Sequence, residues 1–264
     1  MNRKAYQTDL TCEQWKLLKS MLPPPATRGR KRQVDMREVC NAIFYLLHTG
    51  CQWRNLPHEF PAWQTVYGYF RRFKQTGLLA QINDRLRQRL RQHLKRKRSP
   101  SAAIIDSQTV KTTEVGGARG FDAGKLINGR KRHILVDTVG LLLAVVVSAG
   151  NLQDRDGAKL VFKHVQGRFS RLKLIWADAA YGGQLVGWVK EQLRCALEIV
   201  KRRDDVAGFE VQPHRWIVER TLAWISRRRR MSKDYEVLPK TSEAFVYLAM
   251  IHLMLKRLKP AASG

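Results

Sequence analysis

The chain has 264 residues, with 49 Lys or Arg against 22 Asp or Glu, so its formal net charge is +27 at pH 7. A surplus of this size repels itself in a compact chain and indicates a polyanionic partner, and nucleic acid is favoured over a membrane surface. The longest apolar run covers only residues 141–149, which argues against a membrane span. The four cysteines form no Cys-x-x-Cys pair, which argues against a disulfide scaffold and a zinc ribbon. Because the first residues also lack the pattern of a signal peptide, the sequence predicts a cytoplasmic protein.

The first 98 residues are predicted to be all helical. Thr11 and Gln14 have the spacing of a capping box at the start of a helix, which a run of three prolines then ends. Apolar side chains recur at helical spacing in three further segments, at residues 34–48, 62–75 and 78–94. The pattern therefore predicts four helices joined by short loops.

The segment over residues 62–75 is the candidate DNA-reading helix. A helix-turn-helix unit places its second helix in the major groove, where amide, hydroxyl and guanidinium groups contact bases and phosphates. The predicted exposed face of this segment carries such groups at Gln64, Thr65, Arg71 and Arg72. A small helical bundle with a solvated basic face is the alternative, and DNA binding is favoured over it.

A basic segment and a proline mark the predicted domain boundary. Eight Lys or Arg side chains lie within the fourteen residues that end at Arg98, and Ser99-Pro100-Ser101 follows. The residue before a proline is disfavoured in a helix, so we expect a basic linker helix to end here. We therefore predict a helical DNA-binding domain over residues 1–98 and a second domain over residues 99–264.

Beyond the boundary the hydrophobic pattern changes from a helical to a strand period. Short apolar segments predict five strands, at residues 102–105, 133–137, 141–147, 172–177 and 196–200. Helices are predicted between and after them, at residues 154–166, 184–193, 215–227 and 242–256. Three early strands followed by alternation indicate an α/β fold with a mixed five-stranded sheet, antiparallel on one side and parallel on the other.

Two aspartates are expected at the carboxyl ends of predicted strands. Asp106 follows the strand over residues 102–105, and Asp178 follows the strand over residues 172–177. Sites in open α/β sheets form beyond the carboxyl ends of strands, and two carboxylates gathered there need a cation such as Mg²⁺ to offset their repulsion. Either aspartate alone is more often a turn residue. Asp137 also closes a strand and ranks below both, because a hairpin turn follows it.

Arg215 and Glu219 form a third candidate element. They are four residues apart and so share one face of a predicted helix. The alternative is a surface ion pair, which contributes only about 0.3–0.5 kcal/mol. The helix is mostly apolar and continues into four successive arginines at residues 227–230, a run that suits phosphates. These features favour a site that handles a polyanion.

Several sequence blocks resemble the bacterial insertion-sequence DDE transposases, most closely the group numbered family five. The blocks are residues 104–111 (IIDSQTVK), 129–137 (GRKRHILVD), 177–181 (ADAAY), 215–221 (RWIVERT), 228–231 (RRRM) and 234–236 (DYE). Residues 51–57 (CQWRNLP) resemble the helical DNA-binding region that precedes the catalytic domain in that family. The resemblance extends over nearly the whole chain.

The resemblance implies an RNase H-like catalytic domain with Asp106, Asp178 and Glu219 as its triad. It also implies two Mg²⁺ ions, for which Mn²⁺ can substitute, strand nicking at the terminal inverted repeats of double-stranded DNA, and attack of the freed 3′-hydroxyl on target DNA. A homodimer would hold the paired ends. The expected phosphate contacts are Lys131, Arg132, Arg215, Arg227 and Arg228.

One family signature is incomplete in this chain. The pattern Tyr-x2-Arg-x3-Glu-x6-Lys keeps Arg215 and Glu219 but has Gln212 and Ser226 at its first and last positions, with Arg227 as a candidate replacement for the lysine. A non-catalytic DNA-binding protein, such as a repressor, is the alternative function, because it shares the charge and the helices but needs no three carboxylates. A stand-alone structure-specific nuclease is a third interpretation and the least favoured, because such a nuclease would need no sequence-reading helices. A bacterial, nucleoid-associated location is expected.

Overall fold

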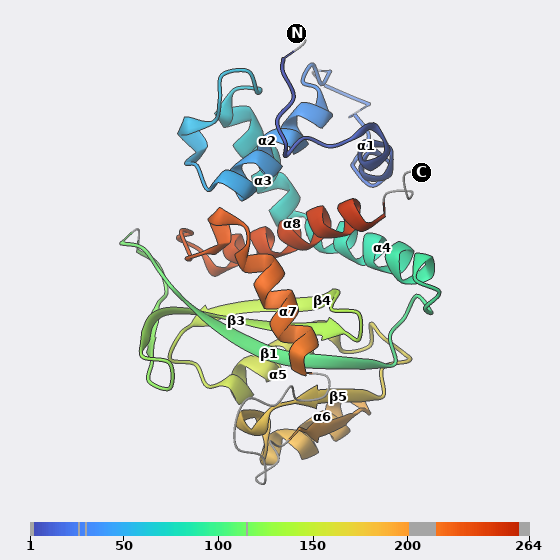
Figure 1. Cartoon of the computed structure of the whole chain (residues 1–264), viewed down its shortest axis with the longest axis vertical. Helices are drawn as coiled ribbons and strands as arrows, with labels where there is room; N and C mark the ends of the chain where they lie inside the picture. Colours follow the sequence, from blue (N-terminus) through green and yellow to red (C-terminus); the bar gives the residue numbers. More distant parts are fainter. Residues whose placement is uncertain (1–2, 26, 30, 115, 201–214, 259–264) are drawn as a thin grey trace.

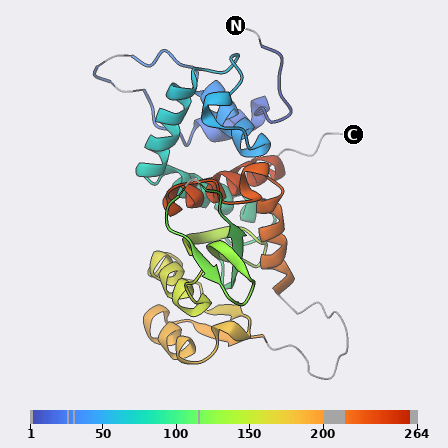
Figure 2. The ribbon, with the colours of Figure 1, turned by 90° about the vertical axis from the view of Figure 1, so that its left-hand side faces the viewer.

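The computed structural model describes residues 3–25, 27–29, 31–114, 116–200 and 215–258. Most of the N-terminal helices lie at one end of the molecule, the sheet lies at the other, and a long C-terminal helix lies between them (Figure 1). The view at right angles shows the same order along the long axis (Figure 2). Within the described residues, every helix is too short or too polar to cross a membrane.

The N-terminal part is helical, as predicted. Its helical segments are α1 (Cys12–Lys19), α2 (Met36–Thr49), the 3-10 turn η1 (Trp53–Asn55), α3 (Trp63–Gln75) and α4 (Leu78–His93). The predicted capping box is confirmed, because the Thr11 amide donates to the Gln14 side chain at 3.1 Å and the Gln14 amide donates to the Thr11 hydroxyl at 3.3 Å. Gly50 ends α2 with a φ of 76°, and a Cβ there would lie 3.2 Å from Arg229 Cβ. Gly50 therefore allows a close approach of the segment around Arg229.

The second part contains a mixed sheet of six strands. They are β1 (Ala102–Lys111), β2 (Gly120–Asp122), β3 (Ile127–Asp137), β4 (Leu142–Ala149), β5 (Leu174–Ala177) and β6 (Ala196–Ile199). The order is β2-β3-β1-β5-β6, and β4 pairs with β3. Pairs β1–β3, β2–β3 and β3–β4 are antiparallel, whereas β1–β5 and β5–β6 are parallel. The predicted division into an antiparallel and a parallel side is confirmed.

Two details of the predicted sheet were wrong. The sheet has six strands rather than five, because β2 covers only three residues, too few to show a strand period. Strand β1 does not end before Asp106 but continues to Lys111, since residues 107–111 pair with β3 despite their polar side chains. Asp106 therefore lies in the middle of its strand, opposite Ile134, and not at the carboxyl end.

Helices cover both faces of the sheet. Helices α5 (Asp154–Val165) and α6 (Gln184–Leu193) share a hydrophobic core with one face, through Ile105 of β1 and Leu135 of β3. Helices α7 (Arg215–Ser226) and α8 (Pro239–Arg257) pack on the other face, through Ile104 and Ile134. Figure 1 shows α7 crossing the strands on this second face.

Helix α8 joins the sheet to the N-terminal helices. Its apolar side chains belong to the same core as those of α1 to α4, and it packs against α4 and β4. Two polar contacts strengthen this junction: Asn83 donates to the Leu142 carbonyl at 2.9 Å, and Arg91 forms a buried ion pair with Asp137 at 2.7 Å. The division into two domains at residue 98 stays a proposal, and the two parts share one continuous core.

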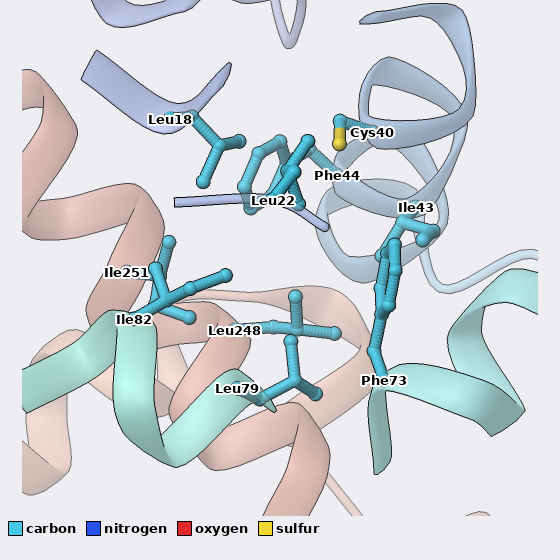
Figure 3. Close-up of a pocket in the computed structure, with 10 residues that line it drawn as sticks. All are labelled: Leu18, Leu22, Cys40, Ile43, Phe44, Phe73, Leu79, Ile82, Leu248 and Ile251. Atoms are coloured by element: carbon cyan, nitrogen blue, oxygen red, sulfur yellow. The ribbon is translucent and has the colours of Figure 1, made fainter. Parts of the chain in front are cut away.

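Helices α1 to α4 and α8 enclose a small apolar cavity of about 20 Å³. Figure 3 shows the side chains that line it, among them Leu18 of α1, Phe44 of α2, Phe73 of α3 and Leu248 of α8. The cavity has room for about one water molecule, but its lining is apolar and offers such a water no hydrogen-bond partner. We therefore describe it as a packing gap rather than a ligand site.

His252 of α8 makes the stability of this core depend on pH. Its ring stacks on Phe44 with 4.8 Å between ring centroids, and burial, followed by the charges of Arg228, Lys256 and His48, lowers its pKa from 6.5 to about 3. Below pH 6.5 the unfolded chain therefore binds a proton that the folded chain does not, and stability falls as the pH drops from 6.5 toward 3.

We expect His252→Gln to remove much of this dependence. Between pH 7.5 and pH 5 the natural chain should lose about 2 kcal/mol of unfolding free energy more than this variant. Urea unfolding at the two pH values measures the difference. The exposed His164 of α5 is the matched control, and His164→Gln should leave the pH dependence unchanged. An equal loss in the natural chain and in His252→Gln would refute the assignment.

Candidate active site

Asp106 and Asp178 come from the neighbouring parallel strands β1 and β5. Asp178 directly follows β5 and caps the 3-10 turn η2 (Ala179–Tyr181), where its carboxylate accepts from the Ala180 amide at 2.9 Å. The Asp106 carboxylate accepts from the Ser107 amide at 2.7 Å. Burial and then the negative charge of Asp178 raise the pKa of Asp106 to about 6. The two carboxylates are thus close enough to repel each other.

Helix α7 brings Arg215 and Glu219 to the same place. The Arg215 guanidinium lies 3.6 Å from the Asp178 carboxylate and 3.4 Å from that of Glu219. Its charge also lowers the pKa of Asp106, against the larger effect of burial. We call Asp106, Asp178 and Glu219 the acidic centre. The Arg215 guanidinium therefore lies beside two carboxylates of the acidic centre and acts electrostatically on the third.

Arg215 lies where a shared cation would otherwise be expected. Within the described parts of the chain, no three His, Cys, Asp or Glu side chains lie close enough together to ligate one metal ion. Oxygen donors that repel one another nevertheless have the chemistry that a hard divalent cation requires. The donor types fit such an ion, and in this structure the arginine provides the positive charge.

The structure describes one of the two positions at which this chain departs from the family signature. Gln212 lies outside the described residues. Ser226, at the last position, accepts a hydrogen bond from the Gln108 side chain at 3.1 Å and so ties the end of α7 to β1. Arg227, the candidate replacement for the lysine, is exposed directly after it.

The structure corrects the expected phosphate contacts at Lys131 and Arg132. Both side chains are buried, because successive residues of β3 point to opposite faces and each face is covered. The Lys131 ammonium lies 3.2 Å from Asp154 and 3.4 Å from Asp122. The Arg132 guanidinium donates to the Met231 carbonyl at 2.8 Å, and burial lowers its pKa to about 10. Their charges are therefore used inside the fold.

His133, a candidate phosphate contact beside this basic run, is also buried. Its Nε2 lies 2.9 Å from the Ser148 hydroxyl, and its ring fills the space where Gly157 of α5 lacks a side chain. Burial lowers its pKa to about 4. His133 is thus a packed histidine that is neutral at physiological pH, and it is not exposed for a phosphate contact.

The arginine run at residues 227–230 is divided between surface and core. Arg227 and Arg229 are exposed. Arg228 is half-buried with its guanidinium 3.2 Å from His48, and Arg230 is buried, 2.7 Å from the Glu236 carboxylate. Of the two run members predicted to contact DNA, Arg227 is therefore placed for a surface contact, while Arg228 packs against the N-terminal helices.

Helix α3 presents its predicted face to solvent. Gln64, Thr65, Arg71 and Arg72 are exposed, while apolar side chains on the opposite side, including Phe70, pack into the core. A surface hollow runs along the exposed face, lined by Thr65, Gly68, Tyr69, Arg71, Arg72 and Gln75. These side chains are thus accessible to a ligand, and they lie on α3, whereas the acidic centre is built from β1, the end of β5 and α7.

Sequence reasoning missed two side chains, Asp154 and Lys125, that contact Ser107 next to Asp106. The Ser107 hydroxyl donates to the Asp154 carboxylate at 2.8 Å, and the Lys125 ammonium donates to the Ser107 carbonyl at 3.3 Å. Lys125 lies on the turn between β2 and β3, and its charge lowers the pKa of Asp106. Nothing in the spacing of residues 125 and 154 links them to Asp106, because the link exists only in the folded sheet.

Comparison with known sequences identifies two matching families and two relatives. The family described as "Transposase DDE domain" matches residues 97–254, and the family described as "Putative transposase of IS4/5 family" matches residues 10–83. A Burkholderia cepacia protein, "Putative transposase for insertion sequence element IS402", is 28% identical over 127 residues, which are 46% of this chain and 60% of that protein. The "Insertion element IS402 uncharacterized 16.2 kDa protein" of the same organism is 28% identical over 110 residues, 39% of this chain and 74% of that protein.

Proposed function

This chain belongs to the family of transposases with a DDE domain, of the IS4/IS5 type, and on that premise we propose that it nicks DNA at the terminal inverted repeats of an insertion sequence and joins the freed 3′-hydroxyl to target DNA. One observation carries the proposal: Asp106 of β1, Asp178 after β5 and Glu219 of α7 gather around Arg215. The mixed sheet with helices on both faces is consistent with the RNase H-like fold.

The acidic centre is proposed to hold divalent metal, which transposases of this family generally use. Asp106 and Asp178 would bind Mg²⁺ or Mn²⁺, with Glu219 as a further ligand, since carboxylate oxygens suit these ions. When bound, such ions make water or a 3′-hydroxyl a better nucleophile and stabilise the leaving oxygen. A cation would also favour the charged form of Asp106, whose pKa is raised by burial and then by the negative charge of Asp178.

Arg215 is proposed to change partners when DNA binds. In the structure its guanidinium compensates the charges of Asp178 and Glu219. A guanidinium that lies among carboxylates awaiting metal is well placed to contact a phosphate group of the substrate, because Arg binds two phosphate oxygens at once. Arg227, exposed at the end of the same helix, would contact a neighbouring phosphate.

The N-terminal helices are proposed to recognise the inverted repeats. The exposed side chains of α3 include two arginines for phosphates, and Gln64 and Thr65 for base edges. The family implies DNA as partner, and the net charge of +27 agrees with it. Because strand transfer joins two ends, we propose a homodimer on paired ends. The chain spans 60% of the length of the IS402 transposase, so we propose these activities from the residues of this chain and do not carry them over from that protein.

A nicking assay tests the proposal. The purified chain is incubated with a duplex that contains an end of the element that encodes it, with Mg²⁺ or with EDTA, and nicks are mapped on a sequencing gel. We expect Mg²⁺-dependent nicks at the boundary of the repeat. Tight binding of the repeat without any metal-dependent nick would instead support the non-catalytic DNA-binding alternative.

A further inference from the structure

The turn between β2 and β3 carries the most exposed large apolar side chain of the described residues. Leu126 is 76% exposed on this turn, and Phe121 on β2 is 53% exposed. Phe121 pairs with Asn128, while its neighbour Asp122 points to the opposite, buried face. The hairpin therefore projects two apolar side chains into solvent.

The backbone at Leu126 is strained in a way that a helix end does not explain. Its φ is 53°, in the left-handed region where a branched side chain is unfavourable and glycine is not. Two other described non-glycine residues have positive φ, and both lie where helices end: Lys95 just after α4, and Arg194 as the cap of α6. The hairpin turn between Asp122 and Ile127 accounts for a left-handed residue, but glycine would fill that position without strain, so an exposed leucine there suggests a function for its side chain.

The turn lies beside the acidic centre. The Lys125 ammonium binds the Ser107 carbonyl at 3.3 Å, next to Asp106 in β1, and the Lys125 charge acts on the Asp106 carboxylate. Leu126 is the next residue along the chain. An exposed apolar side chain therefore lies one residue from a lysine that reaches the backbone beside Asp106.

The charge of the hairpin suits DNA. Arg119 and Lys125 are exposed, and the single acidic residue between positions 119 and 128 is Asp122, whose buried carboxylate lies 3.4 Å from Lys131. Exposed cations flanking an exposed leucine match the way proteins bend duplex DNA, with phosphates held by Arg and Lys and an apolar wedge between two base pairs.

We propose that Leu126 is a wedge that enters the base stack of duplex DNA next to the phosphate held at the acidic centre, with Phe121 beside it. This inference rests on the proposed nicking of DNA. Unstacking one base step would open the duplex and turn the scissile phosphate toward Asp106. The left-handed backbone at Leu126 sets the direction in which the side chain projects.

Leu126→Gly separates this role from a role in folding. Glycine adopts a φ of 53° without penalty, so the variant should unfold at the same temperature as the natural chain or at a higher one. With 2-aminopurine placed at successive positions around the nick site of end-containing DNA, the natural chain should raise the fluorescence by about twofold or more at one step, and the variant should not. Leu160→Ala, at a 39% exposed leucine on α5, is the control and should behave as the natural chain.

Nicking gives a second readout with a rescue. Leu126→Gly should nick the paired duplex about tenfold or more slowly, and two mismatched base pairs at the nick site should restore its rate to within about threefold of the natural chain. Equal fluorescence in both proteins would overturn the inference, as would a slow rate that mismatches do not restore. If the natural chain raises the fluorescence through Leu126 but never nicks, the proposed function fails and the wedge stands.

Discussion

Replacing Asp106, Asp178 or Glu219 singly with alanine is expected to slow Mg²⁺-dependent nicking about a hundredfold or more, because each carboxylate would help to hold a metal ion whose charge stabilisation contributes several kcal/mol. Binding of the end-containing duplex should remain within about threefold, since phosphate contacts by cations dominate DNA affinity. Loss of an acidic side chain from the acidic centre removes repulsion for the phosphate and so does not weaken binding.

The control for these variants is Glu191→Ala, at an exposed carboxylate near the end of α6. It removes the same charge from an exposed position on a helix that carries no member of the acidic centre, and nicking should be unchanged. A sequencing gel gives the nicking rate and a gel-shift titration gives the affinity. Full nicking activity in any one of the three variants would remove that residue from the triad.

Asp137→Ala is expected to lower the free energy of unfolding by about 3–5 kcal/mol, because it leaves the Arg91 guanidinium buried without its partner. The two side chains are 2.7 Å apart, and the Asp137 carboxylate also accepts from the Val139 and Leu141 amides at 2.9 Å each. The ion pair joins α4 to the end of β3, and the variant should therefore weaken the helical part and the sheet together.

Urea unfolding followed by far-ultraviolet circular dichroism measures this loss. The matched control is Asp156→Ala on α5, whose 3.3 Å ion pair with Lys159 is exposed, and it should change stability by less than about 1 kcal/mol. A double variant, Arg91→Met with Asp137→Leu, should recover part of the loss, since an apolar pair can replace a buried ion pair. A change of less than about 1 kcal/mol in Asp137→Ala would contradict the role assigned to the pair.

The sequence predicts the helices and strands well where the hydrophobic period is long. In residues 62–75 the apolar face of a helix is buried as the period requires, and residues 141–147 form a continuous apolar run that is buried throughout. The ranking of Asp137 below Asp106 also agrees with the structure, in which Asp137 caps the turn after β3 and pairs with Arg91. Local pattern was sufficient in these cases because the apolar runs are long and the turn that Asp137 caps follows it directly in the sequence.

Other features depended on contacts between distant segments. The basic run at residues 130–132 looked like a surface for phosphates, but strand β3 is covered on both faces, and polar groups from Asp154 and Met231 receive the charges. Asp106 looked like the end of a strand because the apolar run stops there, whereas pairing with β3 extends β1 by five polar or weakly apolar residues. Pairing and coverage of this kind cannot be read from a local period.

The position of α8 has a consequence for how the protein is made. Helices α1 to α4 leave the ribosome first, yet the helix that completes their core ends at Arg257. At about 5–20 residues per second, their apolar faces stay uncovered for roughly 10–30 s after α4 has been synthesised. An interrupted chain that lacks α8 would thus have an incomplete core in its helical part. The proposed DNA-reading surface can therefore fold fully only after the residues of the acidic centre have been synthesised.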